Sequence, residues 1–358
     1  MRRESFIVLV VGGLLLSACS PIKAAETPQP VETPQPAVLR VMTHDSFAIS
    51  AELVAQFETE HNAKVEFIKA GDAGAALNKA LFTAKNPLAD VFFGVDNTFL
   101  SRALQNQLFE RYDAPALAHI PTEFQLDGGN TALPVDYGDV CINYDKAYFQ
   151  QAGLPLPASL VDLTKPEYKG LLVVENPATS SPGMAFLLAT IAAYGPEDYL
   201  GYWKDLRVND VQVVNDWETA YYTNFSASSG RGPQPMVVSY GTSPAAEVVY
   251  AAQPLTESPT ASLVGDNMCF RQVEFVGILK GTTQRVLAEQ FVDFMLSQPV
   301  QEDIPLQMFM FPVLSTASIP EVFTQNVQVP EHPAVVDPAQ VELHREQWLQ
   351  DWAQAMFE

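Results

Sequence analysis

Two short polar turns carry residues able to bind a ligand. One, SYGTSP at 239–244, follows an apolar run and precedes a helical pattern, and the other, SSP at 180–182, repeats the arrangement. Serine before proline is typical of a helix start, because serine can cap a free N–H group and proline has none to lose. First-turn N–H groups carry partial positive charge. Both turns are therefore predicted to hold a hydroxyl, carboxylate or phosphate oxygen.

Aromatic residues gather in the same part of the chain. Trp217, Tyr221, Tyr222 and Tyr240 lie in or beside predicted turns. Each aromatic face offers a quadrupole to a flat or cationic ring, worth roughly 0.5–2 kcal/mol. Asp72, at a turn in the first half of the chain, can balance positive charge or accept a hydrogen bond from an amine. This set is suited to a flat cationic heterocycle with an oxygen-rich tail.

Catalytic and metal-binding patterns are missing from the sequence. It contains no G-x-S-x-G elbow, no G-x-x-x-x-G-K-[ST] loop and no H-E-x-x-H pair. The five histidines are scattered without the spacing of metal ligands. We therefore predict no catalytic residue, no metal and no cofactor, and the chain is not expected to be an enzyme.

Alternating strands and helices must position these turns. Apolar runs at 38–42, 65–68 and 89–94 are separated by helical patterns at 51–62 and 74–85. This order predicts a parallel α/β sheet with right-handed crossovers, whose ligands bind at the carboxyl ends of the strands. Three polar segments fall at such ends, although each alone is also typical of a solvated loop or helix cap: His44-Asp45, Asp72-Ala73 and Asp96-Asn97.

Length and composition set the domain organisation. The 358 residues exceed one typical domain, and 47% hydrophobic with 17% charged residues is typical of a globular chain. A net charge of -22 argues against nucleic acid and suits a cationic ligand, although acidity often serves only solubility. Segment 133–145 is predicted to cross into a second lobe, and 269–279 to return. The predicted units are lobe 1 (38–134 plus 274–320), lobe 2 (135–273) and a C-terminal helical segment (321–358).

The N-terminus has the pattern of an export signal. Arg2-Arg3 precede an apolar run at 6–16 that is too short to span a bilayer. The run closes on small residues before Cys19, as in a bacterial lipobox. We therefore expect a signal peptide (1–18), a lipid on Cys19 and a Pro-rich linker (19–37) in which ETPQP recurs. The remaining cysteines, Cys141 and Cys269, permit a disulfide or two buried thiols, and the sequence leaves both open.

Several motifs in register resemble the thiamine-binding proteins of bacterial ABC transporters. The resemblance runs from about Val38 to Phe357, and its motifs are THDSFA (43–48), ADVFFGVDN (89–97), PVDYG (134–138), ATSSPG (178–183), VNDWETAY (214–221), SYGTSPA (239–245) and QVEFV (272–276). It implies a two-lobed type II periplasmic-binding-protein fold, each lobe a mainly parallel sheet flanked by helices, joined by two crossing strands. It also implies hinge closure on thiamine or its mono- or diphosphate.

Positions matching the family's ligand contacts follow from this resemblance. They are Asp72, Ala73, Ser180, Ser181, Trp217, Tyr240, Gly241, Thr242 and Ser243, with weaker candidates His44, Asp45, Asp136, Tyr221 and Phe309. The chain departs from the family at His44, which replaces a tyrosine, at Ala246, which replaces an aromatic residue, and at Phe309, which replaces a tryptophan. The loss of ring contacts at these positions is expected to change the affinity and the preference among phosphate esters.

The resemblance also implies the partners. These are an ABC permease and ATPase, with the membrane reached only through the lipid anchor, no nucleic acid, and a monomeric state. Ferric-iron binding on the same fold is the alternative, because iron-binding relatives use adjacent tyrosines and this chain has Tyr221-Tyr222. A third reading is a lipid-anchored hydrolase or structural surface protein, disfavoured by the missing nucleophile site.

Overall fold

The computed structural model describes residues 35–227 and 231–358. The predicted signal peptide, Cys19 and nearly all of the linker lie outside these residues. No helix in the described ranges has the length and apolar character needed to cross a bilayer. Residues 36–358 form one compact unit, to which the description below refers.

Eleven strands of the described part of this unit form one sheet. Their bounds are β1 Ala37–Thr43, β2 Ala63–Lys69, β3 Val91–Asp96, β4 Phe109–Glu110, β5 Leu133–Asp145, β6 Leu172–Glu175, β7 Gln212–Val214, β8 Met236–Tyr240, β9 Thr260–Leu263, β10 Phe270–Leu279 and β11 Phe311–Pro312.

Within residues 35–227 and 231–358, twelve α-helices flank the sheet. They are α1 Ala51–His61, α2 Ala73–Phe82, α3 Leu100–Gln105, α4 Lys146–Ala152, α5 Ser181–Tyr194, α6 Tyr199–Val208, α7 Trp217–Thr219, α8 Ser243–Val249, α9 Arg285–Met295, α10 Gln298–Gln307, α11 Glu321–Asn326 and α12 Pro338–Phe357. Short 3₁₀ turns occupy η1 Pro115–His119, η2 Thr122–Phe124, η3 Leu160–Thr164 and η4 Pro166–Tyr168, and α7 continues as a π-helical turn, η5 Ala220–Asn224.

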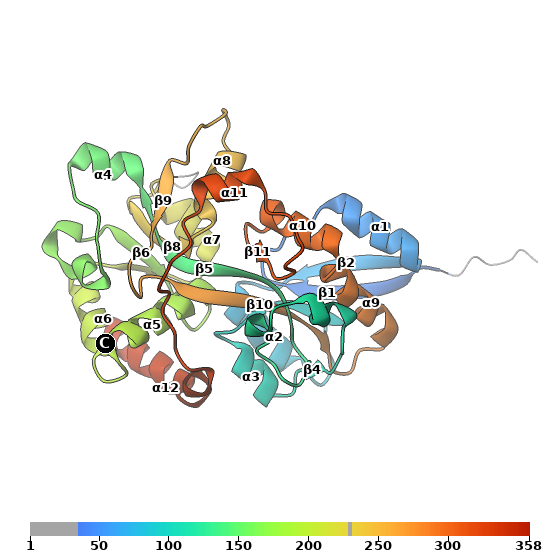
Figure 1. Ribbon diagram of the computed structural model, residues 1–358. Coiled ribbons are helices and arrows are strands. Elements are labelled where there is room, and N and C mark those ends of the chain that lie inside the picture. Colours follow the sequence, from blue (N-terminus) through green and yellow to red (C-terminus); the bar gives the residue numbers. More distant parts are fainter. Residues whose placement is uncertain (1–34, 228–230) are drawn as a thin grey trace, which may run out of the picture. The chain divides into compact units, whose positions relative to one another are not determined.

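The strand order β2-β1-β3-β10-β5-β8-β6-β7 divides the sheet into two lobes. Strands β2, β1 and β3 are parallel in lobe 1, and β8, β6 and β7 are parallel in lobe 2. Between them β5 and β10 pair antiparallel with each other and run from one lobe into the other (Figure 1). The predicted fold class, with mainly parallel lobes joined by two crossing strands, is confirmed.

Burial explains why these segments form the elements they do. Every residue of β3 is buried, which suits a central parallel strand whose apolar run shows no alternation. Helix α5 is buried from Ser181 to Ile191, as expected of a helix that is apolar on all sides. The predicted crossing segment 133–145 coincides with β5, and the predicted helix 74–85 is found at 73–82.

The C-terminal helix α12 packs against α6 of lobe 2 and α3 of lobe 1. The indoles of Trp352 and Trp203 meet edge to face, with ring centroids 5.6 Å apart. On the other side, the guanidinium of Arg345 lies 4.4 Å from the centre of the Phe99 ring and donates to the carbonyl oxygen of Thr98. The aromatic residues of this helix therefore serve packing.

Candidate ligand-binding site

A cavity of about 340 Å³ lies where the two lobes meet. Lobe 1 contributes the loop after β1 and the start of α2. Lobe 2 contributes the start of α5, the α7–η5 segment and the turn from β8 into α8. Strand β10 and residues 307–310, at and after the end of α10, complete the wall. The cavity thus lies at the carboxyl ends of parallel strands, where α/β sheets bind ligands, and its volume suits a small molecule.

An aromatic wall lines one side of the cavity. The indole of Trp217 stacks on Tyr221 with centroids 5.1 Å apart and planes at 22°. Tyr222 and Tyr240 meet the same indole edge to face, at 5.5 Å and 6.2 Å. Trp217 Nε1 donates to Ser239 Oγ at 2.9 Å, which fixes the plane of the ring. Flat ring surfaces held in this way can bind a planar or cationic ring.

Asp72 joins the two lobes at the cavity wall. Its carboxylate caps α2 by accepting from the backbone N–H of Ala73 at 2.7 Å, and it also accepts from the backbone N–H of Trp217 at 3.1 Å. The second bond crosses from lobe 1 to lobe 2, so the two lobes are in contact with each other in this structure. Burial raises the pKa of Asp72 to about 6, although these hydrogen bonds act in the opposite direction.

One carboxylate, that of Glu274, lies on the floor of the site, and other buried carboxylates lie behind it. Glu274 lines the cavity from β10 and stands opposite Asp136 in the β5–β10 register. Burial raises the pKa of Asp136 to about 7, and burial together with the charges of Asp136 and Asp96 raises that of Glu274 well above its usual value. Burial also raises the pKa of Asp96 and of Glu175. Charged forms here are costly until a positive charge enters.

His44 stands beside this acidic floor as a neutral ring. Its Nε2 lies 3.5 Å from Glu274 Oε1, and burial lowers the pKa of His44 to about 4. Gly94 of β3 has a φ of 104°, and a Cβ at this position would lie 2.4 Å from His44 Cδ2. The imidazole therefore packs against a bare stretch of backbone that only glycine provides.

The two serine–proline helix starts lie at the cavity, but their serines are not caps. Ser181 and Ser243 each occupy the first helical position, and neither α5 nor α8 has a side-chain cap at its N-terminus. Their hydroxyls are used elsewhere, because Ser181 Oγ donates to Asp96 and Ser243 Oγ shares a 2.9 Å hydrogen bond with Ser239 Oγ. The predicted helix starts are confirmed, and the predicted capping role of serine is wrong.

Comparison with known proteins agrees with this geometry. Residues 86–331, more than half of the chain, match a family described as bacterial extracellular solute-binding protein. The chain belongs to this family. As a solute-binding protein it is not an enzyme, which confirms the prediction made from the missing catalytic motifs.

Individual relatives show which kinds of solute-binding protein the chain is similar to. The thiamine-binding periplasmic protein of Salmonella typhimurium is 30% identical over 89% of this chain and 93% of its own length. That of Escherichia coli is 29% identical over the same shares. A solved periplasmic thiamin binding protein superposes with a TM-score of 0.79 at 28% identity, covering 90% of this chain and 97% of its own. An iron-bound HitA from Pseudomonas aeruginosa, at 19% identity and a TM-score of 0.72, shares the fold.

The solute-binding protein brings most of the predicted site residues to the cavity. Those on its surface are His44, Asp45, Asp72, Ala73, Ser181, Trp217, Tyr221, Tyr240, Thr242, Ser243 and Phe309. Three predicted residues do not line it, namely Ser180, Gly241 and Asp136. Ser180 and Asp136 are fully buried, and the N–H of Gly241 donates to the carbonyl oxygen of Asp139 at 2.7 Å.

Other lining residues were not predicted. Glu274 is the most important, and its only sequence signal was its place inside the QVEFV motif. Met308 and Met310 flank Phe309 and follow α10, where the sequence has no ligand-binding pattern. Lys69 and Glu218 also line the cavity from exposed positions.

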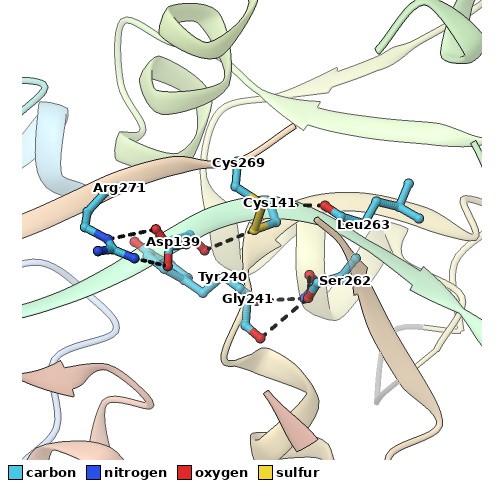
Figure 2. The surroundings of a disulfide bond; sticks show 9 residues. Asp139, Cys141, Tyr240, Gly241, Ser262, Leu263, Cys269 and Arg271 are labelled. Carbon is cyan, nitrogen blue, oxygen red and sulfur yellow. Dashed lines mark hydrogen bonds and ion pairs between the residues drawn. A yellow bond between two sulfur atoms is a disulfide. The ribbon is translucent and has the colours of Figure 1, made fainter. Parts of the chain in front are cut away.

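A disulfide lies behind the β8–α8 turn of the solute-binding protein (Figure 2). It joins Cys141 of β5 to Cys269, which directly precedes β10, with Cα atoms 4.2 Å apart. The partner of Cys141 across β5 and β8 is Ser239, the residue that accepts from the Trp217 indole. The disulfide thus fastens the crossing strands on the lobe 2 side, next to the strand that orients the aromatic wall.

Proposed function

We propose that this extracellular solute-binding protein captures thiamine between its lobes and delivers it to an ABC permease and its ATPase. The observation that carries the proposal is that Trp217, Tyr240, Asp72 and Glu274 line one cavity. Thiamine combines two flat rings with a permanent positive charge. Aromatic faces and buried carboxylates supply what such a molecule needs. The similarity to thiamine-binding periplasmic proteins supports the same ligand.

The residues that line the cavity indicate which part of thiamine each would contact. The rings would lie against Trp217 and Tyr240, and the positive charge would lie near Asp72 and Glu274. The hydroxyethyl end would reach the helix starts at 180–183 and 242–245. Lobe 1 (38–134 plus 274–320) and lobe 2 (135–273) would part by bending at 134–138 and 271–276, because only β5 and β10 cross there within the sheet.

The proposal also covers the lipid anchor expected on Cys19. Residues 1–18 would be removed, Cys19 would carry the lipid, and residues 19–37 would space the monomeric binding unit from the membrane. Labelling cells with an alkyne-tagged fatty acid tests this. The intact chain should be labelled and the Cys19→Ala variant should not, and equal labelling of both would contradict the anchor.

Ferric iron is the competing ligand, and the tyrosines do not favour it. Tyr221 donates its hydroxyl to Glu247 at 2.6 Å and stacks on Trp217, and its ring stands at 85° to that of Tyr222. Burial raises the pKa of both tyrosines, which opposes the phenolate form that iron requires. Among the described residues no group of three His, Cys, Asp or Glu side chains is arranged to hold a metal.

Titration calorimetry with purified protein separates the two ligands. We expect one thiamine to bind per chain with a dissociation constant below about 1 μM, and ferric citrate to give no binding heat. Native mass spectrometry of protein purified without refolding should show an added mass equal to one organic ligand. A coloured protein that binds iron and ignores thiamine would overturn the proposal.

A further inference from the structure

A tyrosine on the cavity surface lies outside the aromatic wall that Trp217, Tyr221, Tyr222 and Tyr240 form. Tyr250 directly follows α8, lines the cavity and is 67% exposed. An aromatic face in water is unfavourable, and a flat ligand that packs on it removes that surface from water. Because single exposed rings are common on proteins, the role of Tyr250 depends on how its neighbours hold it.

Helix α8 presents one continuous face to the cavity. Thr242, Ser243, Ala246 and Tyr250 all line the cavity, and they recur at the spacing of one helical turn. The backbone N–H of Tyr250 donates to the carbonyl oxygen of Ala246 at 2.9 Å, so the last turn of the helix fixes the backbone of Tyr250. Tyr250 is the largest side chain on this face and stands at its C-terminal end.

Phe309 is the partner of this ring. Its centroid lies 5.3 Å from that of Tyr250, with the ring planes at 60°, and Phe309 also lines the cavity. Phe309 is buried and stacks on Phe323 of α11, with centroids 6.2 Å apart and planes at 8°. Tyr250 and Phe309 are far apart in the chain, so the fold brings the two rings together at the cavity surface.

The backbone at Phe309 is strained. Its φ of 54° lies in the left-handed region, which is rare for a bulky residue and persists only where surrounding contacts hold it. Two methionines supply such contacts. Met308 Sδ accepts from the backbone N–H of Ala48 at 3.2 Å, and a Cβ at Gly138 would lie 2.9 Å from Met310 Sδ. Strain of this kind gathers at ligand-binding segments, so it indicates that the position of Phe309 serves a ligand.

Tyr250 also lies near the aromatic wall. Burial raises the pKa of Tyr222, and two neighbouring carboxylates and Tyr250 add to this shift. The hydroxyl of Tyr250 is therefore close to that of Tyr222, whose ring meets the Trp217 indole edge to face. Aromatic side chains thus extend along the lining from the wall to the pair of Tyr250 and Phe309.

We propose that Tyr250 is a further ligand-contacting residue, which forms with Phe309 a second aromatic surface and packs against a ring of the bound ligand. This inference rests on the proposed function, in which the ligand is thiamine. It extends that proposal, because the ring contacts given above involve only Trp217 and Tyr240. Two aromatic surfaces fix a two-ring ligand at more points than the wall alone.

Titration calorimetry with thiamine tests the inference. Tyr250→Ala should weaken thiamine binding about fivefold or more, because the truncation removes the aromatic face. Tyr250→Phe should keep most of the affinity, because it retains the ring, and equal weakening in this variant would contradict a contact through the ring. Wild-type affinity in Tyr250→Ala would overturn the inference and leave thiamine as the ligand. Absence of thiamine binding by the wild-type protein would instead overturn the proposed function.

Val249→Ala is the matched control for the truncation. Val249 directly precedes Tyr250, is 42% exposed and does not line the cavity. Its thiamine affinity should stay within about twofold of the wild-type value. A loss equal to that in Tyr250→Ala would show that the end of α8 has loosened, and would contradict a contact made by Tyr250 itself.

Hydroxyl-radical footprinting gives a readout that does not depend on a substitution. With saturating thiamine, the ring of Tyr250 should be oxidised more slowly than in the ligand-free protein, because the ligand covers it. Phe82 is the internal control, since it is exposed at the end of α2 and does not line the cavity, so its oxidation should not change. Oxidation of Tyr250 that thiamine leaves unchanged would overturn the contact.

Discussion

Replacing Trp217 by alanine should weaken thiamine binding substantially. A buried indole covers about 200 Å², and taking roughly a third of it as facing the ligand gives a loss of about 1.5 kcal/mol at about 25 cal/mol per Å². The lost interaction between the cation and the ring adds about 0.5–1.5 kcal/mol. The sum is about 2–3 kcal/mol, so the dissociation constant should rise by about 30- to 150-fold.

Conservative variants of Trp217 separate the contributions to this loss of binding free energy. Trp217→Phe keeps an aromatic face but removes the indole N–H that donates to Ser239, so it should cost about 1 kcal/mol from the hydrogen bond plus part of the lost area. Trp348→Phe in α12 is the matched control, because Trp348 is buried and does not line the cavity. Affinity in this variant should stay within about twofold of the wild-type value.

Calorimetry measures the affinities, and tryptophan fluorescence gives a second readout. Of the four tryptophans in the chain, Trp217 is the one on the cavity surface. The fluorescence change on adding thiamine should therefore disappear in Trp217→Phe and persist in Trp348→Phe. Thermal unfolding confirms that each variant is folded. Wild-type affinity in a folded Trp217→Ala variant would refute the aromatic wall as a binding surface.

Further predictions concern protons, the disulfide and closure. Thiamine affinity should rise from pH 5 to pH 8, because the carboxylates of Asp72 and Asp136, with pKa values of about 6 and about 7, become negative in this range; calorimetry giving a flat profile would contradict their role. Because the pKa of Asp72 is raised, its carboxyl group keeps a proton in the folded protein that it loses near pH 4 in the unfolded chain. The free energy of unfolding of the ligand-free protein should therefore fall by up to about 3 kcal/mol as pH rises from about 4 to above 6. The stability of Asp72→Asn, measured by urea unfolding at a series of pH values, should fall less steeply with rising pH than that of the wild type. An identical dependence on pH would count against this assignment. Reducing the Cys141–Cys269 disulfide should destabilise the protein by about 2–4 kcal/mol in chemical unfolding, and two free thiols in the unreduced, unfolded protein would exclude it. Small-angle scattering should show a more compact protein with thiamine than without, whereas identical curves would argue against hinge closure.

Local patterns predicted the elements more reliably than their roles. The crossing segment 133–145 has the bounds expected from its apolar run, and the serine–proline pairs mark the helix starts within one residue. The capping role of these serines was wrong, because hydrogen-bond partners such as Asp96 come from a distant part of the chain. The π-helical turn at 220–224 was also not predicted, since nothing in the local periodicity distinguishes it from an α-helix.

The features that could not be predicted from the sequence depend on the pairing of strands that are far apart in the chain. Asp136 lies next to Glu274 on the acidic floor, although it does not line the cavity itself, because the β5–β10 register sets the two residues opposite each other. That register is not encoded in either segment alone. The pairing of Cys141 with Cys269 follows from the same register. Asp72, by contrast, was predicted from its position after a strand, and its bond to Trp217 across the lobes gives that position its meaning.

The central claim is that buried carboxylates and aromatic faces recognise a positive charge in this cavity. Calorimetry comparing thiamine with its isostere, in which the charged thiazolium is replaced by neutral thiophene, tests it most directly because the two molecules have the same shape. The cation should bind about tenfold or more tightly than the neutral ring, with the difference reduced in Asp72→Asn. Equal affinity for both would contradict the claim.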